Sequence, residues 1–190
     1  SAHSAAGHAG TGFFGMFVDS DCSANLTEIV TDRAVLTLPA TRVVLELGST
    51  DRSEVADKIA EIVDGVDEMI EVAYQHKGLF DVSENPNLTR MYGANNDIPG
   101  ARHNIRCMSL GEGEGVCSTN NYIGITWDGV TNVLNIRPIE SATDGTYDSG
   151  EYLGFEIAHA LGHQLTDNAA AIPEVTANYF TQLLTSNDTD

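Results

Sequence analysis

A helical repeat of apolar residues between positions 52 and 76 is the strongest constraint that the sequence places on its own fold. Apolar side chains recur there at intervals of three and four residues, which puts them on one face of a helix. Thr50 or Asp51 suits the N-cap position, and Gly78 follows the end of the repeat. The repeat therefore predicts one long helix over 52–76. Its apolar stripe consists of Val55, Ile59, Ile62, Val63, Val66, Met69, Ile70 and Ala73.

Short runs rich in β-branched residues predict strands on both sides of this helix. Before it, segments 34–38 and 42–48 have this composition and are separated by Pro39. After it, segments 121–127 and 133–138 enclose the turn-like "DGVTN", which predicts a hairpin. The Gly- and Asn-rich stretch before that hairpin is typical of loops.

Two further helices complete the predicted order of elements. One covers 150–165, and the last begins near Pro173, a residue that suits the first turn of a helix. This order predicts an α+β fold: a small mixed β-sheet, a long backing helix, and two C-terminal helices. We divide the chain into 1–50, a tail with strands that is a candidate pro-segment, and a main domain over 51–190.

The charge balance excludes several classes of partner. The chain has 28 acidic residues against 9 lysines and arginines, a net charge of −19. Such a surface repels nucleic acid and anionic membranes, and acidic substrates suit it poorly. No run approaches 18 apolar residues, so we expect no membrane insertion. Simple solubility and adaptation to high salt both explain the acidity, and both explanations stay open.

Three cysteines bear on the compartment of the protein. Cys107 and Cys117 bracket a Gly- and Glu-rich loop, and a disulfide between them is plausible in an exported protein. Cys22 is then left over, and three free thiols in a reducing compartment is the alternative. Together with the acidic surface, the disulfide hypothesis favours an extracellular or cell-surface location, in a halophilic organism if the acidity reflects salt.

Two histidines four residues apart are the main chemical signal. On a helix, His159 and His163 project from one face and can chelate one ion of zinc size. Glu174 is the expected third ligand, because a short loop can fold the next helix back against the first. Asn178, one turn further, is expected to accept a hydrogen bond from a liganding histidine.

Two alternatives to this zinc site are a pair of ordinary core histidines and a different third ligand. Ordinary core histidines are common, but bare imidazoles on an otherwise apolar helix need polar partners. Gly162 between the histidines lowers helix propensity and suggests that another segment approaches closely. Asp167 is a weaker candidate ligand, because it continues or caps the helix.

The motif "HALGHQL" differs by one residue from "HELGHQL", a zincin active-site sequence, and "PEVTANYFTQLL" resembles the glutamate-bearing helix of gluzincins. The chain is most similar to the minigluzincins and the ImmA/IrrE-type peptidases, closely over 155–184 and in layout over 50–184. The resemblance implies a zincin-like fold and a zinc-dependent endopeptidase acting on peptide or protein substrates, with Zn²⁺ held by the two histidines and Glu174. It also implies a strand within 121–138 that pairs with extended substrate.

One residue departs from the family pattern. In zinc peptidases the glutamate after the first histidine acts as general base, and here that position holds Ala160. The chain is therefore expected to be nearly inactive while its metal ligands stay intact. We favour an introduced Glu→Ala replacement over a natural pseudo-enzyme. The competing function is a non-catalytic zinc-binding protein or pseudo-peptidase that acts as a binding module.

Stabilisation of the transition state requires a hydrogen-bond donor as well as the metal. Tyr152, Tyr179 and His103 are candidates, and spacing in the sequence selects none of them.

Overall fold

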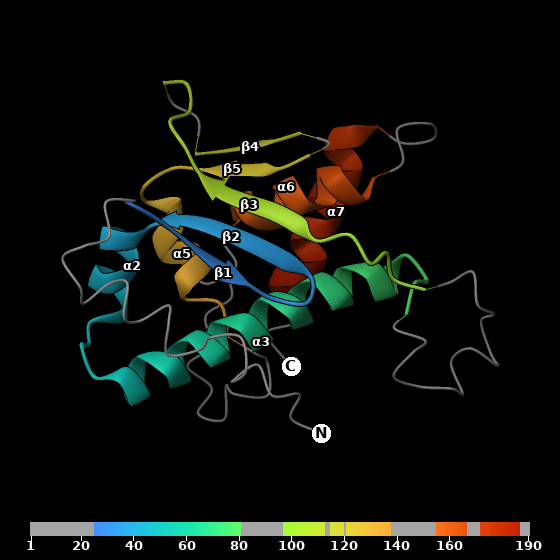
Figure 1. Cartoon of the computed structure of the whole chain (residues 1–190). Helices are drawn as coiled ribbons and strands as arrows, with labels where there is room; N and C mark the ends of the chain where they lie inside the picture. The colour runs from blue at the N-terminus through green and yellow to red at the C-terminus, as the bar shows by residue number, and fades with distance from the viewer. Residues whose placement is uncertain are drawn as a thin grey trace.

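The computed structural model describes residues 25–80, 97–112, 115–119, 121–137, 155–166 and 172–186. These residues form an α+β structure in which helices pack beneath a five-stranded mixed sheet (Figure 1). The predicted fold class is therefore confirmed. The strands are β1 (Leu26–Val30), β2 (Ala34–Pro39), β3 (His103–Cys107), β4 (Val116–Ser118) and β5 (Ile123–Ile125). The helices are α2 (Ala40–Leu47), α3 (Arg52–His76), α5 (Gly129–Leu134), α6 (Phe155–Leu165) and α7 (Pro173–Ser186).

The strands follow the order β1-β2-β3-β5-β4 across the sheet. β3 is parallel to both of its neighbours, whereas β1 and β4 at the two edges are antiparallel to theirs. One register row crosses four strands and is buried throughout: Ile29, Leu36, Ile105 and Ile123. Neighbouring positions such as Val30 and Arg106 point to the other face and are exposed. This alternation is typical of a sheet that is covered by helices on one face only.

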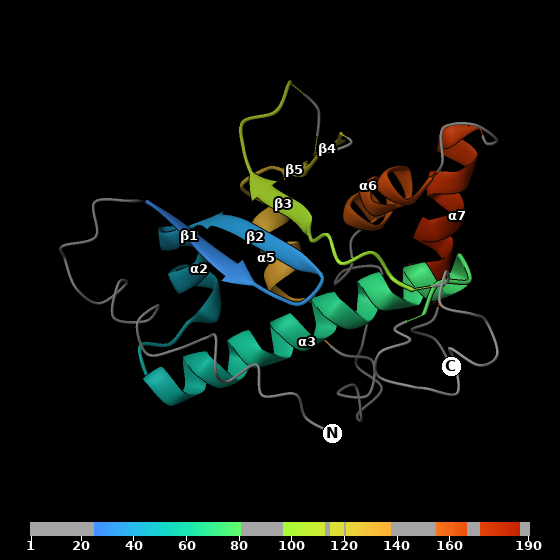
Figure 2. The ribbon, with the colours of Figure 1, turned by 45° about the vertical axis from the view of Figure 1, so that its right-hand side comes forward.

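Helix α3 has the bounds that the apolar repeat predicts, and it runs along the lower side of the molecule (Figures 1 and 2). Asp51 caps it, because its carboxylate accepts hydrogen bonds from the backbone N–H groups of Ser53 and Glu54 at 3.0 and 3.1 Å. The whole predicted stripe is buried. The long helix is therefore confirmed as the backing element of the core.

Two predicted strands fall wholly or partly in helices. Residues 42–48 fall largely within α2, where Val43 and Leu47 are buried one turn apart while Leu45 is 66% exposed. Residues 133–134 end α5, so the predicted hairpin around "DGVTN" is wrong. Both errors have the same cause. Apolar residues at i and i+4 form the buried face of a helix, and this spacing outweighed the preference of valine for strands.

Strand β3 was missed because it lies in a stretch whose composition is typical of loops. Ile105 is its one fully buried side chain, so the segment carries no alternating apolar pattern. It becomes a strand through pairing with β2 and β5, which come from distant parts of the chain. β1 and the three-residue β4 were missed as well.

The predicted disulfide between Cys107 and Cys117 is wrong, and both thiols are free. Cys107 lies opposite Ile125 on one side of β5, and Cys117 lies opposite Gly124 on the other side. Their strands are therefore about 10 Å apart, which is beyond disulfide reach. Because Gly124 and Ile125 are consecutive, the two thiols also point to opposite faces of the sheet. Cys22 lies outside the described residues.

The sheet continues across the domain boundary that the sequence analysis placed at residue 50. β1 and β2 come from before that position and pair with β3 from after it. A cut at residue 50 would therefore remove two strands of the sheet. Residues 1–24 lie outside the described part of the chain, and a pro-segment over 1–50 stays a prediction. Among the described helices, none has the length and apolar character needed to cross a membrane.

Candidate metal centre

Helices α6 and α7 are held at backbone distance by Gly162. A Cβ atom at this position would lie 2.8 Å from the Cα of Ala177 and 3.0 Å from its carbonyl oxygen. Real side chains do not approach so closely, so this crossing requires glycine. The close approach that the sequence predicted at Gly162 is confirmed, and it brings the first turn of α7 beside the histidines of α6.

Three side chains from the two helices converge at this crossing. The Nε2 atoms of His159 and His163 are 3.0 Å apart. The carboxylate oxygens of Glu174 lie 3.2 Å from Nε2 of His159 and 3.5 Å from Nε2 of His163. The histidines are largely buried, whereas the Glu174 side chain is 69% exposed. The cluster therefore opens to solvent on the α7 side.

This donor set fits a zinc ion. One ligand atom from each residue lies within 4.8 Å of the others. Ligands at the usual zinc distances of about 2.0–2.2 Å stand roughly 3.3 Å apart in a tetrahedron, close to the separations seen here. Two imidazoles and one carboxylate are also the protein ligands of many catalytic zinc sites, which leave the fourth position open.

Asn178 supports the cluster from the next turn of α7. Its Oδ1 lies 3.0 Å from Nδ1 of His159 and accepts a hydrogen bond from it. A proton on Nδ1 leaves the lone pair of Nε2 directed toward His163 and Glu174. The structure thus places Asn178 where the sequence predicted it.

A cavity of about 440 Å³ opens beside the cluster. The two histidines, Glu174 and Ala160 form one wall, and Val116, Ser118 and Thr119 form the other. Ser118 joins the walls, because its hydroxyl donates to the carbonyl oxygen of Ala160 at 2.9 Å. The strand beside the cavity is therefore β4, at the edge of the sheet. It lies outside the range 121–138 in which the sequence analysis expected a substrate-pairing strand, and that pairing itself stays a prediction.

Of the three candidate transition-state donors, His103 and Tyr179 are not among the described residues that line this cavity. His103 is engaged elsewhere, through Tyr74 at Nε2 and Gln164 at Nδ1. Tyr179 is 52% exposed and packs edge-to-face on Phe180. Tyr152 lies outside the described residues, as does the alternative ligand Asp167. The hydroxyl groups that do line the cavity belong to Ser118 and Thr119, which the sequence analysis did not single out.

His103 also predicts how stability depends on pH. Burial lowers its pKa from the ordinary value of 6.5, and the hydrogen bond to Gln164 opposes this only in part. The unfolded chain therefore takes up the proton first as pH falls below about 6.5, which favours unfolding. We expect the free energy of unfolding, measured in urea with EDTA present, to fall more steeply below that pH than in His103→Gln. Equal slopes for the two proteins would contradict this.

The sequence matches no family model and no curated protein. Its fold is similar to that of a solved metalloprotease. The structure of the catalytic module of the metalloprotease ZmpA from Clostridium perfringens aligns with a TM-score of 0.56 and 16% sequence identity. The alignment covers 84% of this chain and 26% of that one, so this chain spans about a quarter of the neighbour. At this identity the likeness shows the fold alone, and that fold is shared with the metalloprotease module. Closer assignment to the minigluzincins or ImmA/IrrE-type peptidases stays a prediction.

Proposed function

We propose that this chain is a zinc-dependent endopeptidase domain that carries alanine in place of its general base. The observation that carries the proposal is the convergence of His159, His163 and Glu174 at separations of 3.0–3.5 Å. The metalloprotease-like fold supports it independently of those three residues.

The proposed roles of the side chains follow from their places around the cavity. His159, His163 and Glu174 would hold Zn²⁺, and Asn178 would keep the His159 ring oriented for that task. A zinc ion bound there supplies a Lewis acid that polarises a peptide carbonyl and lowers the pKa of water. The open side of the cluster leaves room for a peptide to approach.

Strand β4 is the proposed substrate-binding element. It is one of the two edge strands of the sheet, and Val116 and Ser118 put it against the cavity. An extended peptide can add to such an edge through backbone hydrogen bonds. Proteins and peptides are therefore the proposed substrates, whereas the net charge of −19 argues against nucleic acid. Because Cys107 and Cys117 form no disulfide, the proposed extracellular or cell-surface location rests on the acidic composition alone.

Ala160 favours a second candidate function. A chain with the metal ligands but without the general base can bind zinc and peptide without cleaving, as a pseudo-peptidase or binding module. The experiment that separates the two is restoration of the carboxylate by Ala160→Glu, followed by a cleavage assay with zinc and unfolded casein. Cleavage supports the peptidase, and its absence in a folded, zinc-loaded variant supports the binding module.

Metal titration tests the site without any assay of activity. We expect one zinc ion per chain, measured by competition with a chromophoric chelator. Asn178→Ala is expected to weaken binding by about 10–100-fold, the usual cost of losing support for a ligand, and His159→Ala by more. His76→Ala, which changes an exposed histidine on α3, is the matched control and should bind as the parent does. Equal affinity in all four proteins would rule out this site.

A further inference from the structure

Gln164 lies directly after the second histidine, and its side chain connects two other elements. Its Nε2 donates to the carbonyl oxygen of Thr119 at 3.0 Å, and its Oε1 lies 2.5 Å from Nδ1 of His103. Thr119 follows β4 and lines the cavity. The two ends of one amide thus reach the cavity wall on one side and the buried part of the sheet on the other.

Thr119 is the first residue of the turn between β4 and β5, and its hydrogen bonds close that turn. Its hydroxyl oxygen accepts from the backbone N–H groups of Asn121 at 3.2 Å and Tyr122 at 3.1 Å. Its own N–H donates to the carbonyl oxygen of Tyr122 at 2.9 Å. The turn is therefore closed on itself, so a bond that fixes Thr119 fixes the end of β4 as well.

Two hydrogen bonds tie this edge of the sheet to α6. Ser118 donates to the carbonyl oxygen of Ala160, and Gln164 donates to that of Thr119. The attachment points on α6 are four residues apart, and each directly follows one of the two histidines. These two bonds therefore fasten the β4 edge directly to the part of α6 that carries the histidines.

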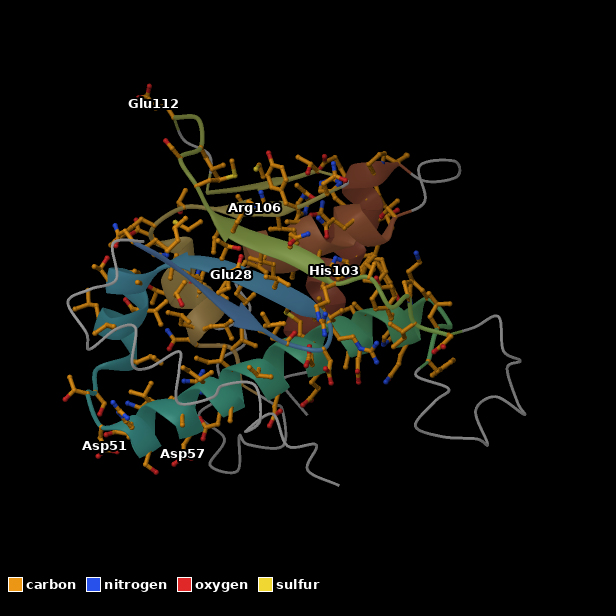
Figure 3. All side chains as sticks on the ribbon, viewed as in Figure 1. Glu28, Asp51, Asp57, His103, Arg106 and Glu112 are labelled. Atoms are coloured by element: carbon orange, nitrogen blue, oxygen red, sulfur yellow. The ribbon has the colours of Figure 1, made fainter. Side chains whose placement is uncertain are left out.

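A buried pair orients the amide of Gln164. His103 lies at the start of β3, between the sheet and α3, where Figure 3 labels it. Its Nε2 is 2.9 Å from the hydroxyl of Tyr74, which is 7% exposed. With Tyr74 donating to Nε2, Nδ1 carries the proton and donates to Oε1 of Gln164. That leaves the NH₂ group of Gln164 as the donor to Thr119.

We propose that Gln164 is a positioning residue that sets the distance between strand β4 and the side chains of the metal cluster. His103 and Tyr74 hold its amide in place. The inference rests on the proposed function and concerns how peptide is placed, whereas metal binding belongs to other side chains. A peptide that pairs with β4 can bring its carbonyl group to the cluster only when β4 lies at the right distance from the cluster. Small displacements of bound groups are costly in such sites.

Gln164→Glu tests the proposal with little change of shape. The carboxylate still accepts from His103, but it faces Thr119 with an acceptor where the NH₂ group donated. Gln164→Met removes both contacts at similar length. The matched control is Gln75→Glu, which makes the same chemical change at an exposed position of α3.

Two zinc-binding probes separate peptide placement from metal binding. Acetohydroxamate contacts the metal alone, whereas a dye-labelled trialanine hydroxamate also extends along β4. In Gln164→Glu and Gln164→Met we expect the peptide probe to bind about tenfold more weakly. That factor corresponds to one hydrogen bond between the probe and a displaced β4. Affinities for zinc and acetohydroxamate should stay within about twofold of the parent. Amide hydrogen exchange should also speed up in 116–122 and remain slow in α6 and α7.

Three outcomes would overturn the inference. If both hydroxamates weaken equally in Gln164→Glu, the residue supports the cluster and does not position the edge. If the parent binds acetohydroxamate but gains nothing from the peptide extension, β4 is not a peptide site. If the zinc-loaded parent binds neither probe, the proposed function fails and the inference fails with it. The first two outcomes overturn the inference but leave the proposed function standing.

Discussion

The zinc-loaded Ala160→Glu protein is expected to cleave dye-quenched unfolded casein about 10²–10⁴-fold faster than the parent chain, the usual contribution of a positioned general base. Position 160 lines the cavity between the two histidines on α6, opposite the β4 wall. A glutamate side chain starting there extends into the same space that the substrate carbonyl would enter. The parent has a methyl group at this point and no carboxylate to move the proton.

Ala160→Gln is the matched control for that experiment. It has the size and polarity of glutamate but cannot act as a base, so it should stay as slow as the parent. Circular dichroism and zinc stoichiometry must match across the three proteins, because position 160 is only 1% exposed and a longer side chain could disturb packing. Activity in the glutamine variant would show that cleavage comes from another source. An inactive, folded and zinc-loaded glutamate variant would favour the binding module.

The second large effect is expected at the helix crossing. Gly162→Ala should lower the free energy of unfolding by about 3 kcal/mol, at the upper end for overpacking, and should weaken zinc binding at least tenfold. The new Cβ would meet the Ala177 backbone at 2.8 Å, and backbone cannot rotate away as a side chain can. Helix α7 must then move outward, which carries Glu174 away from the histidines.

Urea unfolding and chelator competition measure the two effects separately. Gly100→Ala is the control, because a Cβ there meets nothing within 4 Å. If Gly162→Ala keeps both the unfolding midpoint and the zinc affinity of the parent, then the spacing of α6 and α7 does not position Glu174. If stability falls but zinc affinity does not, then α7 accommodates the new methyl group without displacing the turn that carries Glu174.

The cluster of two histidines and one glutamate was predictable from the sequence because its parts are close in the chain. His159 and His163 share one helix, so the helical repeat alone places them on one face. Glu174 and Asn178 lie on the next helix, and a short connection leaves few ways to pack it. The long helix 52–76 was predictable for a similar reason, since its whole pattern lies within one uninterrupted segment.

The parts that depend on distant pairing were not predictable in this way. β3 is a strand only because β2 and β5 flank it, and its composition carries no signal of that. The thiols of Cys107 and Cys117 are near in sequence, but β5 enters between their strands and separates them. The choice of β4 as the cavity wall follows from the same strand order.

The sequence by itself determined the helices with a strong apolar repeat, the three residues of the candidate metal cluster and Asn178 beside it, because these parts lie close together in the chain. Only the tertiary structure decided which strand borders the cavity, where His103 makes its contacts, and that Gln164 joins helix to sheet edge. These features arise from contacts between segments far apart in the chain. Sheet order and register set such contacts, and no local pattern of residues encodes them.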